Sequence, residues 1–254
     1  MKITFLGTGT STGVPVLTCK CEVCRSLDFR DKRLRVSILV QHNGKNIVID
    51  SGPDFRQQAL RENLQSLEAL VFTHEHKDHT GGLDDVRPFN YLSGIKNCPI
   101  YAHPRVLEQL KMEYFYAFSE KPYPGVPIIT CNEIDTEPFE IAGLTFNPIQ
   151  VLHHKLPVLG FRIGDFTYIT DANYISEVEL SKVLGSKVLV LNALQREPHI
   201  SHFNLKEAIE LSEKIGAEKT YFTHISHKLG LHREVEMDLP ANILLAYDGL
   251  SFSL

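Results

Sequence analysis

The sequence predicts an α/β fold of four layers, in which two mixed β-sheets pack face to face and helices cover both outer faces. Short apolar segments bounded by turn residues recur along the chain, as expected of strands. A hairpin pattern comes early, and strand and helix patterns alternate later. No linker rich in Pro, Gly or Ser divides the 254 residues, so we expect one domain spanning residues 1–254.

The first predicted element is a hairpin, because Val36–Val40 and Asn46–Ile49 flank the turn sequence His-Asn-Gly-Lys. The other predicted strands are short apolar runs closed by turn residues: Leu67–Phe72, Pro99–Ala102, Leu144–Val151, Leu159–Ile163, Phe166–Ile169, Val188–Leu191, Thr220–Phe222 and Ile243–Ala246. The predicted helices are Asp54–Asn63, Pro104–Phe118, Ile175–Leu184 and Leu205–Ile215. Asn204 can cap the last of these helices. Residues 92–127 are rich in Tyr and Phe, which indicates either a lid or insertion near the site or aromatic core packing.

Composition and charge limit the classes of function. Hydrophobic residues make up 43% of the chain and charged residues 22%, which is typical of a globular protein. The net charge of -5 provides no general attraction to nucleic acid. The start of the chain lacks the long apolar stretch of a signal peptide, and no run approaches the ~18 apolar residues of a membrane span. We therefore expect a cytoplasmic protein that does not associate with membranes.

A dense group of metal-binding side chains follows the predicted strand Leu67–Phe72. Residues 74–79 read His-Glu-His-Lys-Asp-His, and their three imidazoles and the aspartate can donate lone pairs to divalent cations. In a loop after a strand, His74 and His76 can converge on one ion, while Asp78 and His79 reach a second. A polar surface loop is the simpler interpretation, but further donors later in the chain disfavour it.

Those further donors follow three later predicted strands. They are His153, with His154 beside it, Asp171 and His224. Each alone is more often a loop residue, but together with residues 74–79 they complete the ligand set of two metal ions. An aspartate at such a position can bridge two cations, as two-metal hydrolysis requires in order to hold a hydroxide. The sequence therefore predicts a hydrolase in which Asp78 or Asp171 orients the nucleophile.

Three of the five cysteines lie within six residues, at Cys19, Cys21 and Cys24. An odd number of cysteines with tight spacing does not fit a disulfide framework, whereas it fits thiolate ligation of a metal. His227 is a candidate fourth ligand, which would close a tetrahedral zinc site. Three reduced cysteines in a loop are the alternative, which this spacing makes the weaker of the two.

Taken together, these motifs resemble those of the metallo-β-lactamase superfamily, as do the opening Phe-Leu-Gly-Thr-Gly-Thr and the element Ile-Asp-Ser-Gly at 49–52. The resemblance implies a metallo-β-lactamase fold, with ligands assigned residue by residue. The first metal ion would be held by His74, His76 and His153, and the second by Asp78, His79 and His224. Asp171 would bridge the two ions, and Asp50 would orient the ligand loop through hydrogen bonds.

The resemblance leaves a choice between two adjacent histidines. His153 begins a His-His-Lys-Leu stretch that resembles a His-x-Lys-Leu element of one subfamily. Other subfamilies place the ligand three residues before a proline, here Pro157, which would favour His154. We prefer His153.

The cysteine motif narrows the resemblance. Together with the Thr-His-Ile-Ser-His stretch at 223–227, it resembles the phosphoribosyl cyclic phosphodiesterases of phosphonate breakdown, which open a five-membered cyclic phosphate on ribose. The segment 201–205 resembles the one that carries a catalytic histidine in that family, here His202, for which helix capping is the alternative role. The resemblance implies a small phosphodiester substrate, two active-site Zn²⁺ or Mn²⁺ ions, one structural Zn²⁺ and a homodimer.

Three other functions stay open. A tRNA 3′-end endonuclease of the same superfamily is disfavoured by the acidic balance, and the sequence shows no long basic arm rich in Gly and Pro. Hydrolysis of a thioester or a lactam is compatible with the shared metal core. A non-catalytic metal-binding sensor is disfavoured, because each expected ligand position carries a metal-binding residue.

Overall fold

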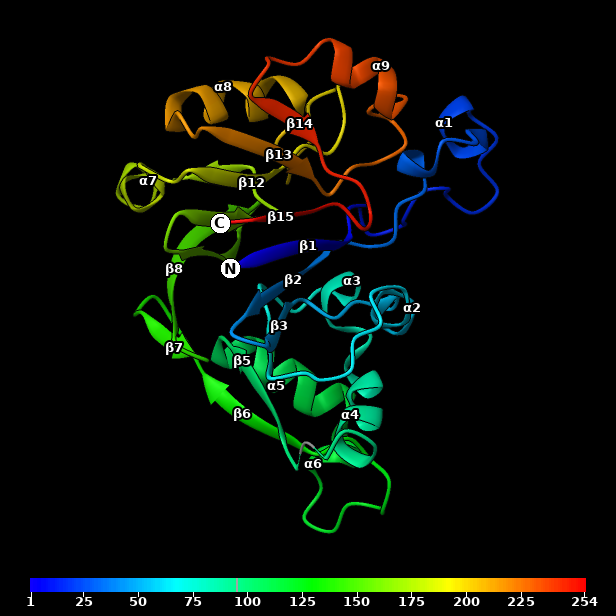
Figure 1. Ribbon diagram of the computed structural model, residues 1–254, viewed down its shortest axis with the longest axis vertical. Coiled ribbons are helices and arrows are strands. Elements are labelled where there is room, and N and C mark those ends of the chain that lie inside the picture. The colour runs from blue at the N-terminus through cyan, green and yellow to red at the C-terminus, as the bar shows by residue number, and fades with distance from the viewer. Residues whose placement is uncertain (95) are drawn as a thin grey trace.

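Two β-sheets lie face to face in the computed structural model, which describes residues 1–94 and 96–254, and helices cover their outer faces (Figure 1). This arrangement confirms the predicted four-layered α/β fold. Among these residues the first sheet has seven strands, in the order β15-β1-β2-β3-β4-β5-β6. They are β1 (Lys2–Gly7), β2 (Ser37–His42), β3 (Lys45–Ile49), β4 (Ala69–Val71), β5 (Cys98–Ala102), β6 (Ile129–Glu133) and β15 (Ser251–Ser253).

The second sheet has the order β11-β8-β9-β10-β12-β13-β14, and β7 pairs with β8 beside this path. Its strands are β7 (Phe139–Ile141), β8 (Leu144–His153), β9 (Leu156–Ile163), β10 (Phe166–Ile169), β11 (Tyr174–Ile175), β12 (Val188–Asn192), β13 (Lys219–Thr223) and β14 (Ile243–Leu245). Both sheets are mixed: β3 to β6 run parallel in the first, and β10, β12, β13 and β14 run parallel in the second.

Side-chain alternation along the strands builds the layers. In β2, Ile38 and Val40 enter the core between the sheets, while Leu39 enters the core under the outer helices. Successive side chains of a strand point to opposite faces, so a strand buried on both faces needs apolar residues at every position. Phe146 and Phe161 of the second sheet pack into the same central core.

The helices fall into two outer layers (Figure 1). On the first sheet lie α2 (Phe55–Arg61), α4 (Arg87–Tyr91) and α5 (Pro104–Glu113), and on the second lie α7 (Glu177–Val183), α8 (Leu205–Ile215) and α9 (His232–Met237). The short helical segments are α1 (Glu22–Arg25), α3 (Lys77–Thr80), α6 (Phe115–Phe118) and the two 3₁₀ turns η1 (Phe29–Asp31) and η2 (Leu83–Val86). Asn204 caps α8 as predicted, in a reciprocal capping box with Glu207.

Some predicted elements have different boundaries. The predicted helix Pro104–Phe118 is wrong in its middle, because Tyr114 leaves the helical conformation (φ -107°, ψ 35°) and separates α5 from α6. The hydroxyl of Tyr114 instead donates to the Thr80 carbonyl oxygen. The aromatic segment 92–127 contributes β5, α5 and α6, and within it Tyr114 is buried whereas Phe115 and Tyr123 are exposed.

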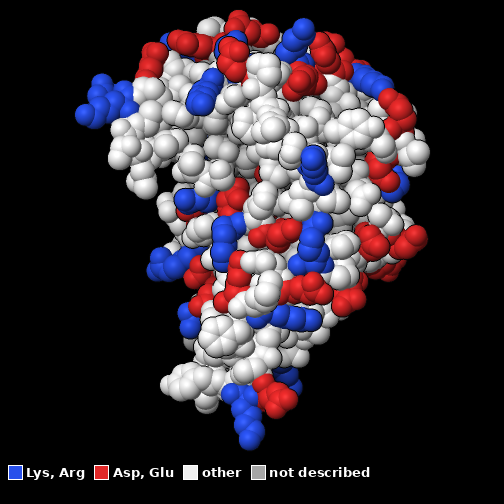
Figure 2. All heavy atoms as spheres, turned by 180° about the vertical axis from the view of Figure 1, so that it is seen from behind, with Lys and Arg blue, Asp and Glu red and all other residues white. Residues whose placement is uncertain are grey.

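The surface carries both signs of charge. On the face shown in Figure 2, acidic and basic side chains are interspersed over both halves of the molecule. No helix in the described part of the chain has the length and apolar character needed to cross a membrane.

Candidate metal centre

The predicted metal ligands converge at one end of the two sheets, where parallel strands of both sheets finish. β3 and β4 run parallel in the first sheet, and β10, β12 and β13 run parallel in the second, so the loops after these strands lie at the carboxyl ends of the strands. Ligands typically bind at such ends in sheets of this kind. Asp50, Asp171 and His224 each follow one of these strands and have positive φ angles of 64°, 54° and 55°. Left-handed backbone is uncommon for residues other than glycine and is often found at functional sites.

Four side chains form the most compact group, as the resemblance implied for the second ion. His79 Nε2 lies 3.4 Å from Asp78 Oδ2 and 3.3 Å from Asp171 Oδ1. His224 Nε2 lies 3.6 Å and 3.2 Å from the same two carboxylate oxygens. Ligands about 2.0–2.2 Å from a tetrahedral Zn²⁺ are separated from one another by about 3.4 Å. The spacing of this group therefore fits one tetrahedral ion.

The second group shares Asp171. His74 Nε2 lies 3.0 Å from His76 Nδ1 and 3.9 Å from Asp171 Oδ2. The His153 ring lies 5.1 Å from that of His76 between centroids. His153 Nδ1 donates to the Ser201 carbonyl oxygen at 2.8 Å, which leaves Nε2 as the nitrogen with a free lone pair. Asp171 thus presents one oxygen to each group, the arrangement expected of a bridging carboxylate.

The two adjacent histidines differ in their surroundings. His153 is half-buried and shares a candidate ligand group with Asp171 and His202. His154 occupies the β8–β9 turn with φ 57°, and it is exposed. The geometry brings the preferred residue to the cluster and leaves its neighbour outside.

Asp50 lies behind the ligands, where the sequence predicted an orienting role. It is fully buried, and its carboxylate accepts hydrogen bonds from the Thr73 amide at 2.9 Å and the Thr73 hydroxyl at 2.8 Å. His79 Nδ1 lies 2.7 Å from the same carboxylate and donates to it. This contact fixes the tautomer of His79 and directs Nε2 toward Asp78 and Asp171.

His202 also reaches the cluster. Its Nε2 lies 3.2 Å from Asp171 Oδ2, and its Nδ1 lies 3.1 Å from the Ser201 hydroxyl. Burial lowers the pKa of His202 to about 4, so the imidazole is neutral near pH 7. His199, in the loop between β12 and α8, lies with Nδ1 3.2 Å from His202 Nδ1. The sequence spacing of three residues was the signal for this contact, but the loop between β12 and α8 has no periodicity from which to infer it.

The carboxylates and imidazoles of the cluster shift one another's pKa. Burial would raise the pKa of Asp171, but His224 and His79 hold it well below its ordinary range. Burial would lower the pKa of His79, but Asp171 and Asp78 hold it well above its ordinary range. A proton on His79 therefore counters the carboxylates in the metal-free protein, a role that a cation can take over.

The donor atoms themselves fit a metal. Nε2 of His79 and both ring nitrogens of His224 are buried without a hydrogen-bond partner among the described residues. Buried polar atoms are nearly always satisfied, so the Nε2 atoms of His79 and His224 beside two carboxylates fit a cation site.

The structure brings the three cysteines of the motif together with His227, apart from the cluster at the strand ends. The Sγ atoms of Cys19, Cys21 and Cys24 lie 3.3, 3.4 and 3.6 Å from His227 Nδ1. Ligands bound to a tetrahedral Zn²⁺ through sulfur at ~2.3 Å and nitrogen at ~2.0 Å are about 3.5 Å apart. The backbone amide of Cys21 lowers the pKa of Cys19, and that of Cys24 lowers the pKa of Cys21, whereas burial raises the pKa of Cys24 to about 11. A thiolate at Cys24 therefore needs a positive charge nearby, which a metal ion would supply. The four residues therefore fit a structural zinc site.

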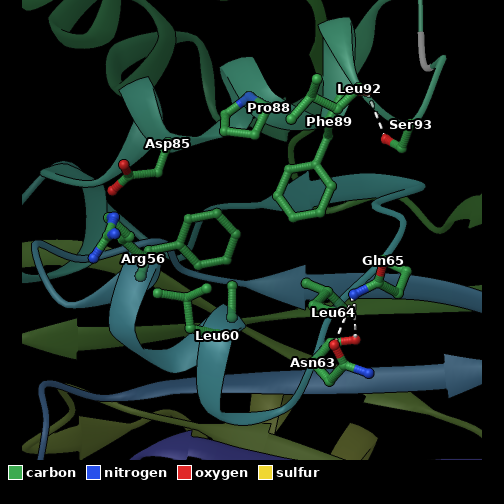
Figure 3. Close-up of a pocket in the computed structure, with 12 residues that line it drawn as sticks. Arg56, Leu60, Asn63, Leu64, Gln65, Asp85, Pro88, Phe89, Leu92 and Ser93 are labelled. Atoms are coloured by element: carbon green, nitrogen blue, oxygen red, sulfur yellow. Dashed lines mark hydrogen bonds between the residues drawn. The ribbon is translucent and has the colours of Figure 1, made fainter.

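An apolar cavity of about 410 Å³ lies elsewhere, between α2 and α4 (Figure 3). Leu60, Leu64 and Phe89 line it, with Arg56 and Asp85 at one end. None of the metal-binding side chains described above lines this cavity. The candidate catalytic site is therefore the cluster of metal-binding side chains at the strand ends, here called the strand-end cluster.

Comparison with known proteins places the chain in a family. Residues 45–225 match the beta-lactamase superfamily domain. The crystal structure of a diphosphatase from the PhnP family is similar over 100% of this chain and 97% of its own, with 40% identity and a TM-score of 0.93. Zn²⁺-bound PqqB from Methylobacterium extorquens has a TM-score of 0.78 at 20% identity, over 100% of both chains, which shows a shared fold.

A curated relative is named for a different kind of activity. The octanoyltransferase of Porphyromonas gingivalis (strain ATCC BAA-308 / W83) is 41% identical over 253 residues, which are 98% of this chain and 51% of the relative. The chain spans about half the length of the curated relatives it matches. About half of that octanoyltransferase therefore has no counterpart in this sequence.

Proposed function

This chain belongs to the beta-lactamase superfamily and, within it, to the PhnP family, and from this premise we propose that it is a metal-dependent hydrolase of phosphodiester or diphosphate bonds. The observation that carries the proposal is Asp171, whose two oxygens face the two ligand groups. Two ions held in this way, Zn²⁺ or Mn²⁺, would supply a water of lowered pKa and stabilise charge on the phosphoryl oxygens. The 40% identity to a PhnP-family diphosphatase supports a phosphorus centre as the target.

The side chains divide the work. Asp171 and Asp78 accept hydrogen bonds and can orient the attacking water in line with the scissile bond. His202 is neutral near pH 7, because burial lowers its pKa to about 4. A neutral imidazole donates a hydrogen bond through Nε2–H, so His202 is suited to hold a phosphoryl or leaving oxygen. Proton transfer to the leaving oxygen would require the imidazolium form, so the neutral side chain is suited to hydrogen bonding rather than to general-acid catalysis near pH 7.

Turnover on a substrate panel tests the proposal. The panel contains a five-membered cyclic ribose phosphate, bis(p-nitrophenyl) phosphate, a diphosphate-linked dinucleotide and an oligoribonucleotide, assayed with protein of measured metal content. We expect the cyclic or diphosphate substrates to be hydrolysed best. Activity confined to the oligoribonucleotide, with steep salt dependence, would instead indicate the endonuclease. No turnover of any phosphate substrate by the metal-loaded protein overturns the proposal.

Variants connect turnover to the assigned residues. His202→Ala should lower kcat by about 100-fold, a typical contribution of a group that acts in the transition state, without changing metal content. His153→Ala should reduce metal content. His154→Ala is the matched control and should change neither, because that side chain is exposed. Unchanged turnover of His202→Ala would exclude its role.

A second candidate activity is thioester hydrolysis. The observation that favours it is the name of the P. gingivalis relative, octanoyltransferase, at 41% identity. An S-octanoyl thioester in the same panel tests it directly. Hydrolysis of the thioester with no turnover of phosphate substrates would replace the phosphoester proposal.

A further inference from the structure

We propose that Arg105, at the start of α5, is a positioning residue that holds the metal-binding loop of the first sheet against the ligand hairpin of the second. The inference rests on the metal centre of the proposed function but not on the substrate. Glu75 and Lys77, which lie between the metal-binding residues of the loop, pair with residues of α5.

Residues 74–79 use alternate side chains for different purposes. His74, His76 and Asp78 contribute donor atoms to the cluster. Glu75, between the first two, turns its carboxylate to Arg105, with Oε1 2.8 Å from Nε and Oε2 3.2 Å from Nη2. The guanidinium thus lies within ion-pair distance of the carboxylate, and its Nη2 donates the one hydrogen bond between the two side chains.

Arg105 also reaches the other sheet. Its Nη2 donates to the Pro157 carbonyl oxygen at 2.7 Å. Pro157 is the second residue of β9, and it pairs with Leu152, next to His153. One guanidinium therefore connects the loop that carries His74 and His76 with the hairpin that carries His153.

Arg105 is itself held in place. α5 begins with Pro104, and the Arg105 amide donates to His103 Nδ1 at 3.2 Å in the helix cap. At the other end of α5, Glu113 pairs with Lys77 at 2.6 Å, so the helix contacts the metal-binding loop at two points. Side chains of Arg105 and Glu75 are 36% and 19% exposed, so solvent screens this pair only in part.

The three contacts require the planar fork of arginine. Nη2 has two hydrogens in the guanidinium plane, one for Glu75 Oε2 and one for the Pro157 carbonyl oxygen, while the rest of the guanidinium places its charge beside the carboxylate. A lysine would keep the charge, but its single ammonium cannot reproduce this fixed geometry. Arg105→Lys is therefore a conservative variant that separates positioning from charge.

Metal affinity is the decisive measurement, because it does not depend on substrate. Competition with a chromophoric chelator is measured for wild type, Arg105→Met, Arg105→Lys and Glu75→Gln. Outer partners of metal ligands typically affect affinity by 10- to 100-fold, and we expect about tenfold weaker binding in Arg105→Met at the strand-end site. Arg105→Lys should recover at most part of this loss. Visible absorption of the Co²⁺-loaded protein should also shift, since the angles between ligands change.

Two controls separate positioning from stability. Arg87 forms a surface pair with Asp84 at 3.2 Å, and neither residue belongs to the ligand cluster, so Arg87→Met should leave affinity unchanged. The cysteine site of the same chain should keep its metal in every variant. In a double mutant, Arg105→Met and Glu75→Gln should weaken binding by less than the product of their separate effects. Affinity within twofold of wild type in Arg105→Met, or a loss of stability without a loss of affinity, overturns the inference.

Discussion

His232 should make the stability of this protein depend on pH in a defined window. The residue is buried, and Arg33 Nη2 lies 3.0 Å from its Nδ1. A guanidinium can only donate, so Nδ1 must be the unprotonated acceptor. Burial and the charge of Arg33 lower the pKa of His232 to about 3. The charge of Arg30 acts in the same direction and that of Asp28 opposes it, while the partly exposed Glu236 carboxylate lies 3.4 Å from Nε2.

The sign follows from the two pKa values. The folded pKa is about 3 and the ordinary value is 6.5, so the unfolded chain takes up a proton first as the pH falls. The stabilising contribution is therefore complete above pH 6.5 and is lost progressively toward pH 3. From pH 8 to pH 5 the pH passes through about 1.5 units of this window. At about 1.4 kcal/mol per unit, the contribution of His232 to the free energy of unfolding falls by about 2 kcal/mol.

The assay is urea unfolding of wild type and His232→Gln at pH 8 and pH 5, with equal metal content. Glutamine can accept from Arg33 but does not titrate, so the difference between the two proteins isolates His232 from every other group. We expect this difference in unfolding free energy to move by about 2 kcal/mol in favour of the variant at pH 5. His42→Gln, in the β2–β3 hairpin, is the control. A difference that stays constant within about 0.5 kcal/mol would refute the reasoning.

Three further predictions follow from the site and the core. Asp50→Asn should weaken metal binding at the strand-end site by about 10- to 100-fold in a chelator titration, because His79 loses the carboxylate that orients it; unchanged affinity would exclude that role. Cys24→Ser should lower the metal content by about one ion per chain in elemental analysis, whereas equal content would contradict the structural site. Phe161→Ala should lower the unfolding free energy by about 3–5 kcal/mol, because the ring is fully buried against Phe146; a loss below about 1 kcal/mol would show that the core collapses around the gap.

The sequence predicts those features that are local. The ligand motif at residues 74–79 is visible because six adjacent residues carry the chemistry. The hairpin of β2 and β3 is visible because its turn sequence and apolar runs agree with each other. Asp171 and His224 become candidates because each follows a recognisable apolar strand.

Features set by distant contacts are not visible in the same way. β15 is a three-residue strand that pairs with β1 from the opposite end of the chain, so its sequence alone carries little signal. At the break, the Tyr114 hydroxyl donates to the Thr80 carbonyl oxygen, a tertiary contact that helix propensity does not encode. The contact between Glu75 and Arg105 spans 30 residues. No local pattern in the sequence indicates that these two residues meet.

The positions of the ligands explain why metal binding and folding should be linked in this chain. Asp50, Asp171 and His224 adopt left-handed backbone conformations, which cost about 1–3 kcal/mol each and persist only where the surroundings determine them. Asp50 and Asp171 are also buried carboxylates, and burial of charge is unfavourable unless hydrogen bonds and opposite charge offset it. His79 lies between them, and its proton offsets only one negative charge. Divalent cations at this point would compensate both costs at once, so the same residues that prepare the chemistry make the folded state depend on the metal.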